Sequence, residues 1–508
     1  MKRSILLFST IFLITIFCSF NRTSAQGLFQ KKYVTGSGTT APGCSKIMYS
    51  PWDSGYFAFE TLYIPLDTGA IFTSFDINGN IKNCKVYNMT ATSSCVPLTA
   101  NLLADTTLDL LLKISWRSYS LKLDTAGNLL RAMVYPMEVR MWNQCVHDNH
   151  IYQVGTTDDA ITPGLFIKQD TSGQSLWAMS YNMNPGLILS QVIASPGGGF
   201  LLAGNSDQKL ILIKTDSSGN IQWQKQYRYD IHSMYPRSLI NTSDNGYILI
   251  VGEASNGNSQ FLKVDSVGNV LWHFGLTGMK FQKISKHSDT SYISTGVNSG
   301  EVVSLVIDSA GNLLKSMQYS TGEINFTVDN QYSETRGLIT YSESKLFGVS
   351  NGYMFLKTDT SLIGPCIADT LAPVKYSYPI TDSIPGVTAS PYLVIMQNIT
   401  SYILVGNPNL LETDFCSPTG ISEPEDKAKF SATVYPVPAI DKVIFELSGY
   451  GVEKNSIQIY DQTGRIIFSE HFTGNSFSLI RNNLPTGLYF YQLISQGQAA
   501  TGKFLFEQ

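Results

Sequence analysis

The sequence predicts an all-β protein: a β-propeller, interpreted as seven four-stranded blades, followed by a small C-terminal β-sandwich. A short phrase, Asp-x-x-Gly, usually followed by Asn, recurs along the chain at intervals of 43 to 51 residues. The copies begin at Asp76, Asp124, Asp170, Asp216, Asp265 and Asp308, with a degenerate copy at Asp359. The composition agrees with a turn-rich β protein, because the chain has 41 glycines and only 15% charged residues.

The repeated phrase has the chemistry of a β-hairpin turn. Asp favours the opening of a type I turn, because its carboxylate accepts hydrogen bonds from the backbone two residues further on. Gly then takes the positive-φ position that closes the turn. In the clearest copy, apolar runs flank the turn over residues 261–272. Each copy therefore predicts two paired strands.

Two aromatic side chains keep fixed distances from the repeated Asp. The tryptophans, seven residues after it, are Trp177, Trp223 and Trp272, and the tyrosines, eleven after it, are Tyr87, Tyr135, Tyr181, Tyr227 and Tyr319. These offsets differ by an even number, so both side chains lie on one face of a strand. We interpret them as packing between blades rather than as a platform for sugars.

A second turn precedes most copies, as in residues 195–200, 242–247 and 287–292. One repeat therefore contains four strands in 43 to 51 residues, which is typical of a propeller blade. An open solenoid or a string of sandwiches is the alternative, but a closed ring removes exposed sheet edges. We expect the propeller domain within residues 26–378, with a strand at 33–37 completing the last blade.

Residues 1–25 have the features of a signal peptide. Lys2 and Arg3 precede an apolar core over residues 5–20, and Ala25 ends a small-x-small cleavage site. A membrane anchor is the alternative, but it needs about 20 apolar residues. We expect no transmembrane segment in the mature chain.

Six cysteines remain after removal of the signal peptide, and an even number in an exported protein suggests disulfides. Cys84–Cys95 is the first expected pair, because it is local. Cys366–Cys416 is the second, because it would staple the segment after the last blade. The alternative is that some cysteines stay as buried thiols.

Two segments follow the repeats. Residues 379–416 fit no repeat, and they are expected either to complete a blade or to form a small irregular β appendage. Residues 417–429 contain no aromatic residue and are rich in Pro and charge, which is typical of a linker. Residues 430–508 again alternate apolar and polar side chains, as in a small β-sandwich.

The last segment carries several short motifs in a fixed order. They contain Tyr435, Pro436, Pro438, Asp461, Gly464, Pro485, Gly487 and Lys503. With these motifs the segment resembles the type A C-terminal sorting domain of the type IX secretion system of Bacteroidetes, although Val437 stands where the family usually has Asn. The Asp-x-x-Gly-Asn repeats are similar to those of propeller-like secreted proteins of the same bacteria.

The resemblance implies the export route. The type IX machinery would be a partner, and it would carry the folded protein from the periplasm through the outer membrane. The sorting domain would then be cleaved, and the protein would be released or attached to the cell surface. We therefore expect that deletion of residues 430–508 traps a folded propeller in the periplasm, and that the mature protein ends before Tyr435.

No catalytic signature stands out in the sequence, and we expect no cofactor and no metal. The net charge of −4 offers no basic field for nucleic acid. The repeated Asp residues could bind Ca²⁺ only if several oxygens converged, and each carboxylate is already engaged by its turn. His147 and His150 fall in a tight turn, so we interpret them as solvated.

Topology indicates where a ligand would bind. The first and third turns of each blade share one face and are tight, whereas the second loop and the blade-to-blade connections share the other face and vary. Two of these connections are rich in aromatic and basic residues: Arg140, Trp142, Tyr229, His232, Tyr235 and Arg237. Such side chains suit recognition of a glycan or a protein, although ordinary loop packing is the alternative.

The sequence thus favours an exported binding or adhesion protein without enzymatic activity. A polysaccharide lyase or hydrolase on a propeller scaffold is the alternative, and a surface-layer scaffold is a third hypothesis. Two carboxylates about 5–10 Å apart in the mouth of the loop face would favour a glycosidase.

Overall fold

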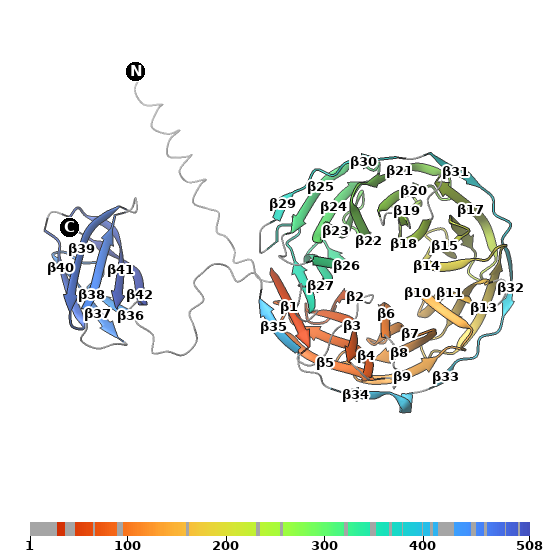
Figure 1. Cartoon of the computed structure of the whole chain (residues 1–508), viewed down its shortest axis with the longest axis horizontal. Coiled ribbons are helices and arrows are strands. Elements are labelled where there is room, and N and C mark those ends of the chain that lie inside the picture. The colour runs from red at the N-terminus through yellow and green to blue at the C-terminus, as the bar shows by residue number, and fades with distance from the viewer. Residues whose placement is uncertain are drawn as a thin grey trace, which may run out of the picture. The chain divides into compact units, whose positions relative to one another are not determined.

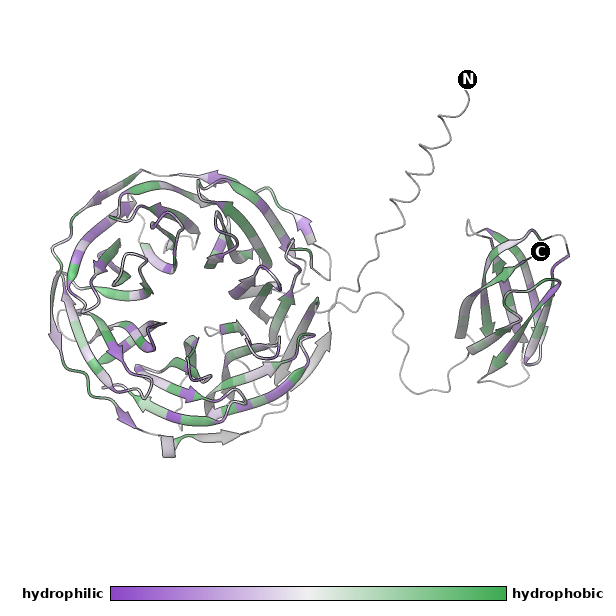
Figure 2. Cartoon of the chain, turned by 180° about the vertical axis from the view of Figure 1, so that it is seen from behind, coloured by the Kyte–Doolittle hydropathy of each residue, from purple (hydrophilic) through white to green (hydrophobic). Residues whose placement is uncertain are grey.

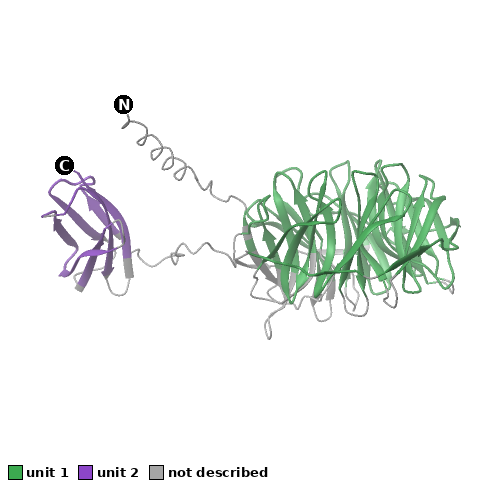
Figure 3. Ribbon diagram, turned by 90° about the horizontal axis from the view of Figure 1, so that it is seen from above, with its two compact units in different colours: residues 1–418 green, residues 419–508 purple. Residues whose placement is uncertain are grey.

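The computed structural model describes most of the chain, divided into two compact units at Pro418 and Thr419 (Figure 3). The described residues are 28–35, 46–64, 67–88, 95–158, 162–229, 234–253, 258–319, 324–345, 352–364, 368–377, 379–398, 400–406, 410–414, 431–448, 454–461, 465–482, 484–495 and 498–507. The expected signal peptide and linker lie outside these ranges, as do Cys44, Cys366, Cys416, His232 and Gly464.

The prediction of an all-β protein is confirmed. Strands account for the regular structure of the described residues, apart from one short 3-10 helix, η1 (Thr400–Tyr402). Within those ranges, no helix has both the length and the apolar character needed to cross a membrane.

Seven five-stranded antiparallel sheets make up the described part of the first unit, and Figure 1 shows them arranged around a ring. Sheet 1 contains β2 (Lys46–Tyr49), β3 (Tyr56–Ile64), β4 (Asp67–Phe75) and β5 (Ile81–Asn88). Sheet 2 contains β6 (Cys95–Leu102), β7 (Leu108–Ile114), β8 (Arg117–Leu123) and β9 (Leu129–Val134). Sheet 3 contains β10 (Val139–His147), β11 (His150–Thr157), β12 (Gly164–Gln169) and β13 (Ser175–Asn182).

The remaining sheets follow in chain order. Sheet 4 contains β14 (Ile188–Ala194), β15 (Phe200–Ser206), β16 (Lys209–Thr215) and β17 (Ile221–Tyr229). Sheet 5 contains β18 (Met234–Asn241), β19 (Tyr247–Glu253), β20 (Ser259–Val264) and β21 (Val270–Leu276). Sheet 6 contains β22 (Met279–Lys286), β23 (Ser291–Asn298), β24 (Glu301–Asp308) and β25 (Leu313–Tyr319). Sheet 7 contains β26 (Ile324–Ser333), β27 (Gly337–Lys345), β28 (Gly352–Lys357) and the N-terminal β1 (Phe29–Thr35).

The fifth strand of every sheet comes from one later segment, residues 368–414, which we name the belt. Its strands are β29 (Ala368–Thr370), β30 (Lys375–Tyr376), β31 (Ile380–Ser383), β32 (Thr388–Tyr392), β33 (Gln397–Asn398), β34 (Leu404–Gly406) and β35 (Leu410–Asp414). They pair in turn with sheets 6, 5, 4, 3, 2, 1 and 7, so the chain runs back along the outer rim (Figure 1). The segment without repeats therefore adds an outer strand to each sheet rather than a separate appendage.

The N-terminal strand lies inside sheet 7. β1 pairs with β28 on one side and with β35 on the other, and Tyr33 is opposite both Tyr353 and Glu412. The sequence predicted a strand at residues 33–37 completing the last repeat, and β1 provides it at Phe29–Thr35.

Apolar clusters fill the junctions between neighbouring sheets, and Figure 2 shows hydrophobic stretches along the strands. The first and last sheets are also in contact, because Ile47 and Tyr56 of sheet 1 pack with Tyr341 and Phe355 of sheet 7. Where the repeated tyrosine is present, it ties its sheet to the next: Tyr227, for example, donates a hydrogen bond of 2.6 Å to the carbonyl of Gly268. The repeated aromatic residues thus pack between sheets, as the sequence predicted.

The repeated turn has the expected geometry. In the copy at Asp265, one carboxylate oxygen accepts hydrogen bonds from the backbone N–H groups of Val267 and Asn269. The other oxygen accepts from the side-chain amide of Asn269 at 2.9 Å, which explains the Asn of the phrase. Gly268 has a φ of 87°, a value that glycine adopts without strain.

The second unit is a two-sheet β structure around a common core. One sheet has the order β36 (Ser431–Tyr435), β37 (Lys442–Ser448), β40 (Ser476–Ile480). The other has the order β39 (Ile466–Thr473), β38 (Lys454–Tyr460), β41 (Gly487–Ser495), β42 (Gln498–Phe506). Phe445, Ile459 and Leu493 belong to the buried cluster of this unit.

The prediction of a Cys84–Cys95 disulfide is wrong. Both residues are free thiols in the structure. Cys84 lies in β5, the outermost of the four repeat strands of sheet 1, whereas Cys95 begins β6, the innermost strand of sheet 2. The two cysteines thus lie in different sheets, one toward the outer side and one at the inner edge, so closeness in sequence does not bring the sulfur atoms together.

Candidate functional site

The connectivity of the ring gives it two different faces. We name turn face the face that carries the first and third turns of each sheet, including Asp-x-x-Gly. The loop face carries the second turn and the connection to the next sheet. Because successive strands are antiparallel, every sheet follows this rule.

Two indoles and two cations meet on the loop face of sheets 2 and 3. Lys113 is next to the last residue of β7, Trp116 lies in the turn to β8, and Arg140 and Trp142 lie near the start of β10. With Asp158, which follows β11, they form what we name the loop-face cluster. It contains both residues that the sequence proposed for the first of the two connections, Arg140 and Trp142.

Cation–π contacts hold the cluster together. The Lys113 Nζ lies 4.4 Å from the ring centre of Trp142 and 5.6 Å from that of Trp116. The Arg140 guanidinium lies 4.7 Å from the ring centre of Trp116 and also pairs with the Asp158 carboxylate. Trp116 is 66% exposed, so one large aromatic surface faces solvent.

Backbone irregularity places Trp142. The pairing of β10 with β11 shifts between Met141 and Asn143, which leaves Trp142 in a β-bulge. A bulge turns its side chain away from the regular alternation. The inner strands of sheets 4, 5 and 6 have the same shift, with Ser190, Arg237 and Gln282 in the place of Trp142.

A buried polar network connects β10 to sheet 2. Gln144 donates a hydrogen bond of 3.0 Å to the carboxylate of Asp109, which also accepts from Arg131 at 2.8 Å and Ser120 at 3.1 Å. Complete burial raises the pKa of Asp109, although the Arg131 guanidinium acts in the opposite direction. Breaking this network would leave buried polar groups unpaired, so we expect it to be rigid.

The second predicted group does not join the first. Arg237 donates hydrogen bonds to the Tyr235 hydroxyl at 2.7 Å, to Ser259 Oγ at 3.1 Å and to the Phe281 carbonyl at 3.1 Å. Since Phe281 belongs to β22, Arg237 ties sheet 5 to sheet 6. His232 lies outside the described residues, and of Tyr229 the structure describes the backbone alone.

Sequence reasoning missed Lys113, Trp116 and Asp158. All three lie at or beside the second turn of their sheet. Trp116 is one of the two residues of the turn between β7 and β8. A Trp in such a turn is a usable signal, because a tight turn offers it little to pack against. Among the described residues, no three His, Cys, Asp or Glu side chains are grouped so as to hold a metal ion.

The second unit presents the C-terminal motifs of the sequence. Pro436 and Pro438 follow β36, an edge strand, where a residue without an N–H costs no sheet hydrogen bond. Asp461 accepts hydrogen bonds from the backbone and the guanidinium of Arg465, both at 3.1 Å. Lys503 lies in β42 opposite Phe490.

Residues 433–507 match the secretion system C-terminal sorting domain. The protein is therefore exported, and it is secreted or attached to the outer surface. The sorting domain spans nearly all of the second unit, from β36 to β42, and it interacts with the secretion machinery.

Two solved structures that are similar to this chain have TM-scores below 0.5. A polysaccharide lyase, Uly1, is 11% identical with a TM-score of 0.43, covering 63% of this chain and 91% of that one. A protein from Lactobacillus plantarum is 12% identical with a TM-score of 0.39, covering 72% and 100%. Such values carry no argument about function. No curated protein sequence matches the chain.

Proposed function

We propose that the protein is an exported seven-bladed β-propeller that binds an acidic glycan at its loop-face cluster. The ring of seven sheets, with sheets 1 and 7 in contact, supports the closed propeller. The single observation that carries the binding function is the exposed Trp116 indole, flanked by the charged groups of Lys113 and Arg140.

The chemistry of the cluster favours an acidic sugar polymer. A flat indole offers a face to the C–H groups of a sugar ring, and its polar neighbours set the orientation. A guanidinium can bind a carboxylate or sulfate through two parallel hydrogen bonds. In the bound state, Arg140 would exchange its contact with Asp158 for the acidic group of the glycan.

Binding of the full-length protein to polygalacturonate and alginate, with neutral dextran for comparison, tests this function. We expect Trp116→Ala and Arg140→Gln to weaken polyuronate binding by roughly tenfold or more, as for other interface anchors. The affinity should also fall as salt is added.

Lys280→Gln provides a matched control. Lys280 is exposed, and it lies two residues before the bulge of β22, as Arg140 lies two residues before the bulge of β10. Its replacement should leave binding unchanged. The absence of polyuronate binding would contradict the proposal, and cleavage of either polymer would favour the polysaccharide-acting enzyme instead.

We also propose that the sorting domain is removed after export. Deletion of residues 430–508 should leave the ring folded and periplasmic, because the two units have separate cores. Mass spectrometry of the exported protein should show a C-terminus before Tyr435. A C-terminal peptide containing Lys503 on most molecules would contradict this cleavage.

A further inference from the structure

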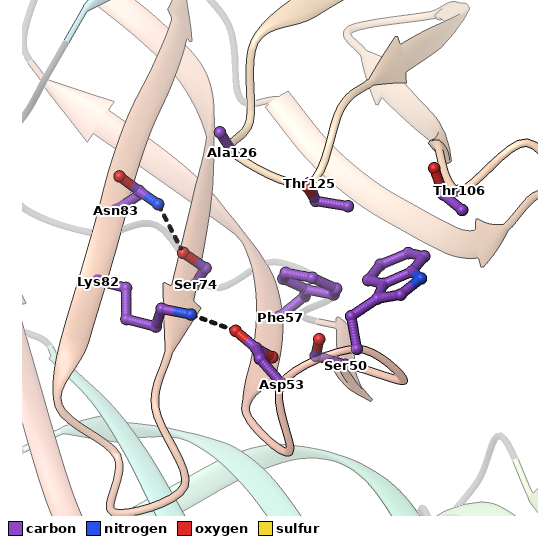
Figure 4. Close-up of a pocket in the computed structure, with 10 residues that line it drawn as sticks. Ser50, Asp53, Phe57, Ser74, Lys82, Asn83, Thr106, Thr125 and Ala126 are labelled. Atoms are coloured by element: carbon purple, nitrogen blue, oxygen red, sulfur yellow. Dashed lines mark hydrogen bonds and ion pairs between the residues drawn. The ribbon is translucent and has the colours of Figure 1, made fainter.

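A pocket of about 380 Å³ opens on the turn face, between sheets 1 and 2 (Figure 4). Its walls include Trp52 and Asp53 from the first turn of sheet 1, Lys82 and Asn83 from β5, and Thr125 from the third turn of sheet 2. It lies on the opposite face from the loop-face cluster, and it does not depend on the function proposed for that cluster.

The pocket exists because one side chain of the repeat is replaced. At two other junctions, the residue seven positions after the repeated Asp is a Trp that reaches the next sheet. Trp223 Nε1 donates to the carbonyl of Ser266 at 3.1 Å, and Trp272 Nε1 donates to that of Ser309 at 3.0 Å. In sheet 1 this position is occupied by Asn83.

Even where the Trp is absent, longer side chains fill the same place. Arg131 donates to the carbonyl of Thr171 at 3.2 Å, and Lys315 donates to that of Ser361. Asn83 is shorter, and its amide turns to Ser74 Oγ of its own sheet at 3.4 Å (Figure 4). The space in front of Thr125 therefore stays open.

An aromatic wall borders this space. Trp52 is 44% exposed, and its ring centre lies 6.2 Å from that of buried Phe57, so the indole is supported from one side. The corresponding first turns, at residues 103–107, 195–199, 242–246 and 287–291, contain no Trp. The Trp52 indole is thus specific to sheet 1 and does not belong to the repeated pattern.

The polar groups around the pocket include both donors and acceptors. Lys82 forms an ion pair with the carboxylate of Asp53 (Figure 4). Partial burial acts to raise the pKa of Asp53, but the hydrogen bonds from Lys82 and Ser50 outweigh it and lower the pKa below its usual value. The carboxylate is therefore charged at neutral pH, and it neutralises the cation beside it.

We propose that this pocket binds a single pyranose residue, with the sugar ring on the Trp52 indole and its hydroxyls on Asp53, Lys82 and Asn83. The C–H groups of a pyranose ring suit the negative face of an indole. Hydroxyl groups both donate and accept, as a carboxylate, an ammonium and an amide together require. A phosphate or another anion is disfavoured, because Asp53 offsets the charge of Lys82.

Saturation-transfer NMR of the full-length protein with methyl pyranosides of glucose, galactose, mannose and N-acetylglucosamine tests the proposal, with affinities from titration. We expect at least one of these sugars to bind. Trp52→Ala should weaken that binding by roughly tenfold or more. Asn83→Trp restores the side chain of the other junctions and should abolish binding by filling the pocket.

Two comparisons keep the test decisive. Leu314→Ala removes an apolar side chain that is 59% exposed on sheet 6, and it should bind like the unchanged protein. The thermal unfolding temperature of Asn83→Trp should not fall, since the variant fills a cavity. The proposal is overturned if none of the four sugars binds at about 10 mM, a very weak affinity, or if both pocket variants bind as the unchanged protein does. Neither result depends on polyuronate binding.

Discussion

The repeat strands and the belt belong to the same seven sheets but are built by different rules. The repeat strands have 4 to 10 residues, and their side chains fill the junctions between sheets. The belt strands have 2 to 5 residues, and the belt leaves apolar side chains in solvent, with Ile384 77% and Leu393 79% exposed. Side-chain packing thus dominates within the ring, whereas the belt combines backbone hydrogen bonds at the sheet edges with a few buried side chains, namely Val387, Val394 and Ile403.

The largest expected effect comes from removing the belt. A protein truncated after Gly364 would expose the outer edges of all seven sheets, and one truncated after Pro418 would keep them covered. We expect the shorter protein to be less stable by on the order of 5 kcal/mol, because each missing backbone hydrogen bond contributes about 1 kcal/mol and the conformational entropy of ordering the belt offsets much of that sum. We also expect it to self-associate through its exposed edges. Urea unfolding and light scattering of the two proteins measure this difference, and equal stability would show that the belt does not contribute.

The next largest difference in stability between the repeat strands and the belt should come from replacing a glycine in each of them by alanine. Gly268 has a φ of 87°, and a Cβ there would lie 3.0 Å from Trp223 and from the Tyr227 hydroxyl. We expect Gly268→Ala to cost about 2 kcal/mol, measured by urea unfolding. Gly386 of the belt has nothing within 4 Å of such a Cβ, so Gly386→Ala should change stability by less than about 0.5 kcal/mol. Similar losses at the two positions would contradict the comparison.

Several side chains link the belt to the ring, among them Asp382, which pairs with Lys225, and Tyr376, which donates a hydrogen bond to Glu253. Thr400 is another. The backbone N–H of Ala132 in β9 donates a hydrogen bond of 2.7 Å to Thr400 Oγ1. Thr400→Val keeps the shape but removes the acceptor, and we expect a loss of about 1 kcal/mol by thermal unfolding. The neighbouring exposed Ser401 serves as the control, and Ser401→Ala should unfold at the unchanged temperature.

The smallest expected change in stability comes from lowering the pH, which acts on the Asp residues of the repeat turns. Burial acts to raise the pKa of Asp216, but hydrogen bonds from the Asn220 side chain and from the backbone outweigh it and lower the pKa. Because the pKa of Asp216 is lower in the folded protein than in the unfolded chain, its ionised carboxylate stabilises the fold at any pH above the unfolded-state pKa. This stabilisation is lost as the pH falls through the folded-state pKa. The stability difference between the unchanged protein and Asp216→Asn should therefore shrink below about pH 4. A difference that stays constant down to pH 2 would show that the charge of Asp216 is irrelevant to the turn.

These differences explain what the sequence could predict. The repeat strands were predictable because their turns are local: Asp265 and Gly268 act within five residues. The belt was not, because a two-residue strand such as Lys375–Tyr376 has no alternation to detect and depends on an edge far away in sequence. The Cys84–Cys95 prediction failed for the same reason, since position across a sheet is not a local property.

The candidate site was predictable in part. Arg140 and Trp142 followed from the rule that variable connections share one face, and the structure brings them together. Their partners Lys113 and Trp116 belong to the preceding sheet, and only the packing of two sheets shows that they meet. The pocket at Trp52 could not be predicted from one repeat alone, because it arises where Asn83 is shorter than the equivalent side chains at the other junctions between sheets.

The position of β1 between β28 and β35 also bears on how the ring could be re-engineered. Lys31 is opposite Asp414, so the chain enters and leaves sheet 7 at the same end of neighbouring antiparallel strands. A short peptide could join these two points, and new termini could then be opened in any of the exposed turns. In topological terms the described part of the ring is a nearly closed loop of chain, and both of its ends lie at one seam in sheet 7.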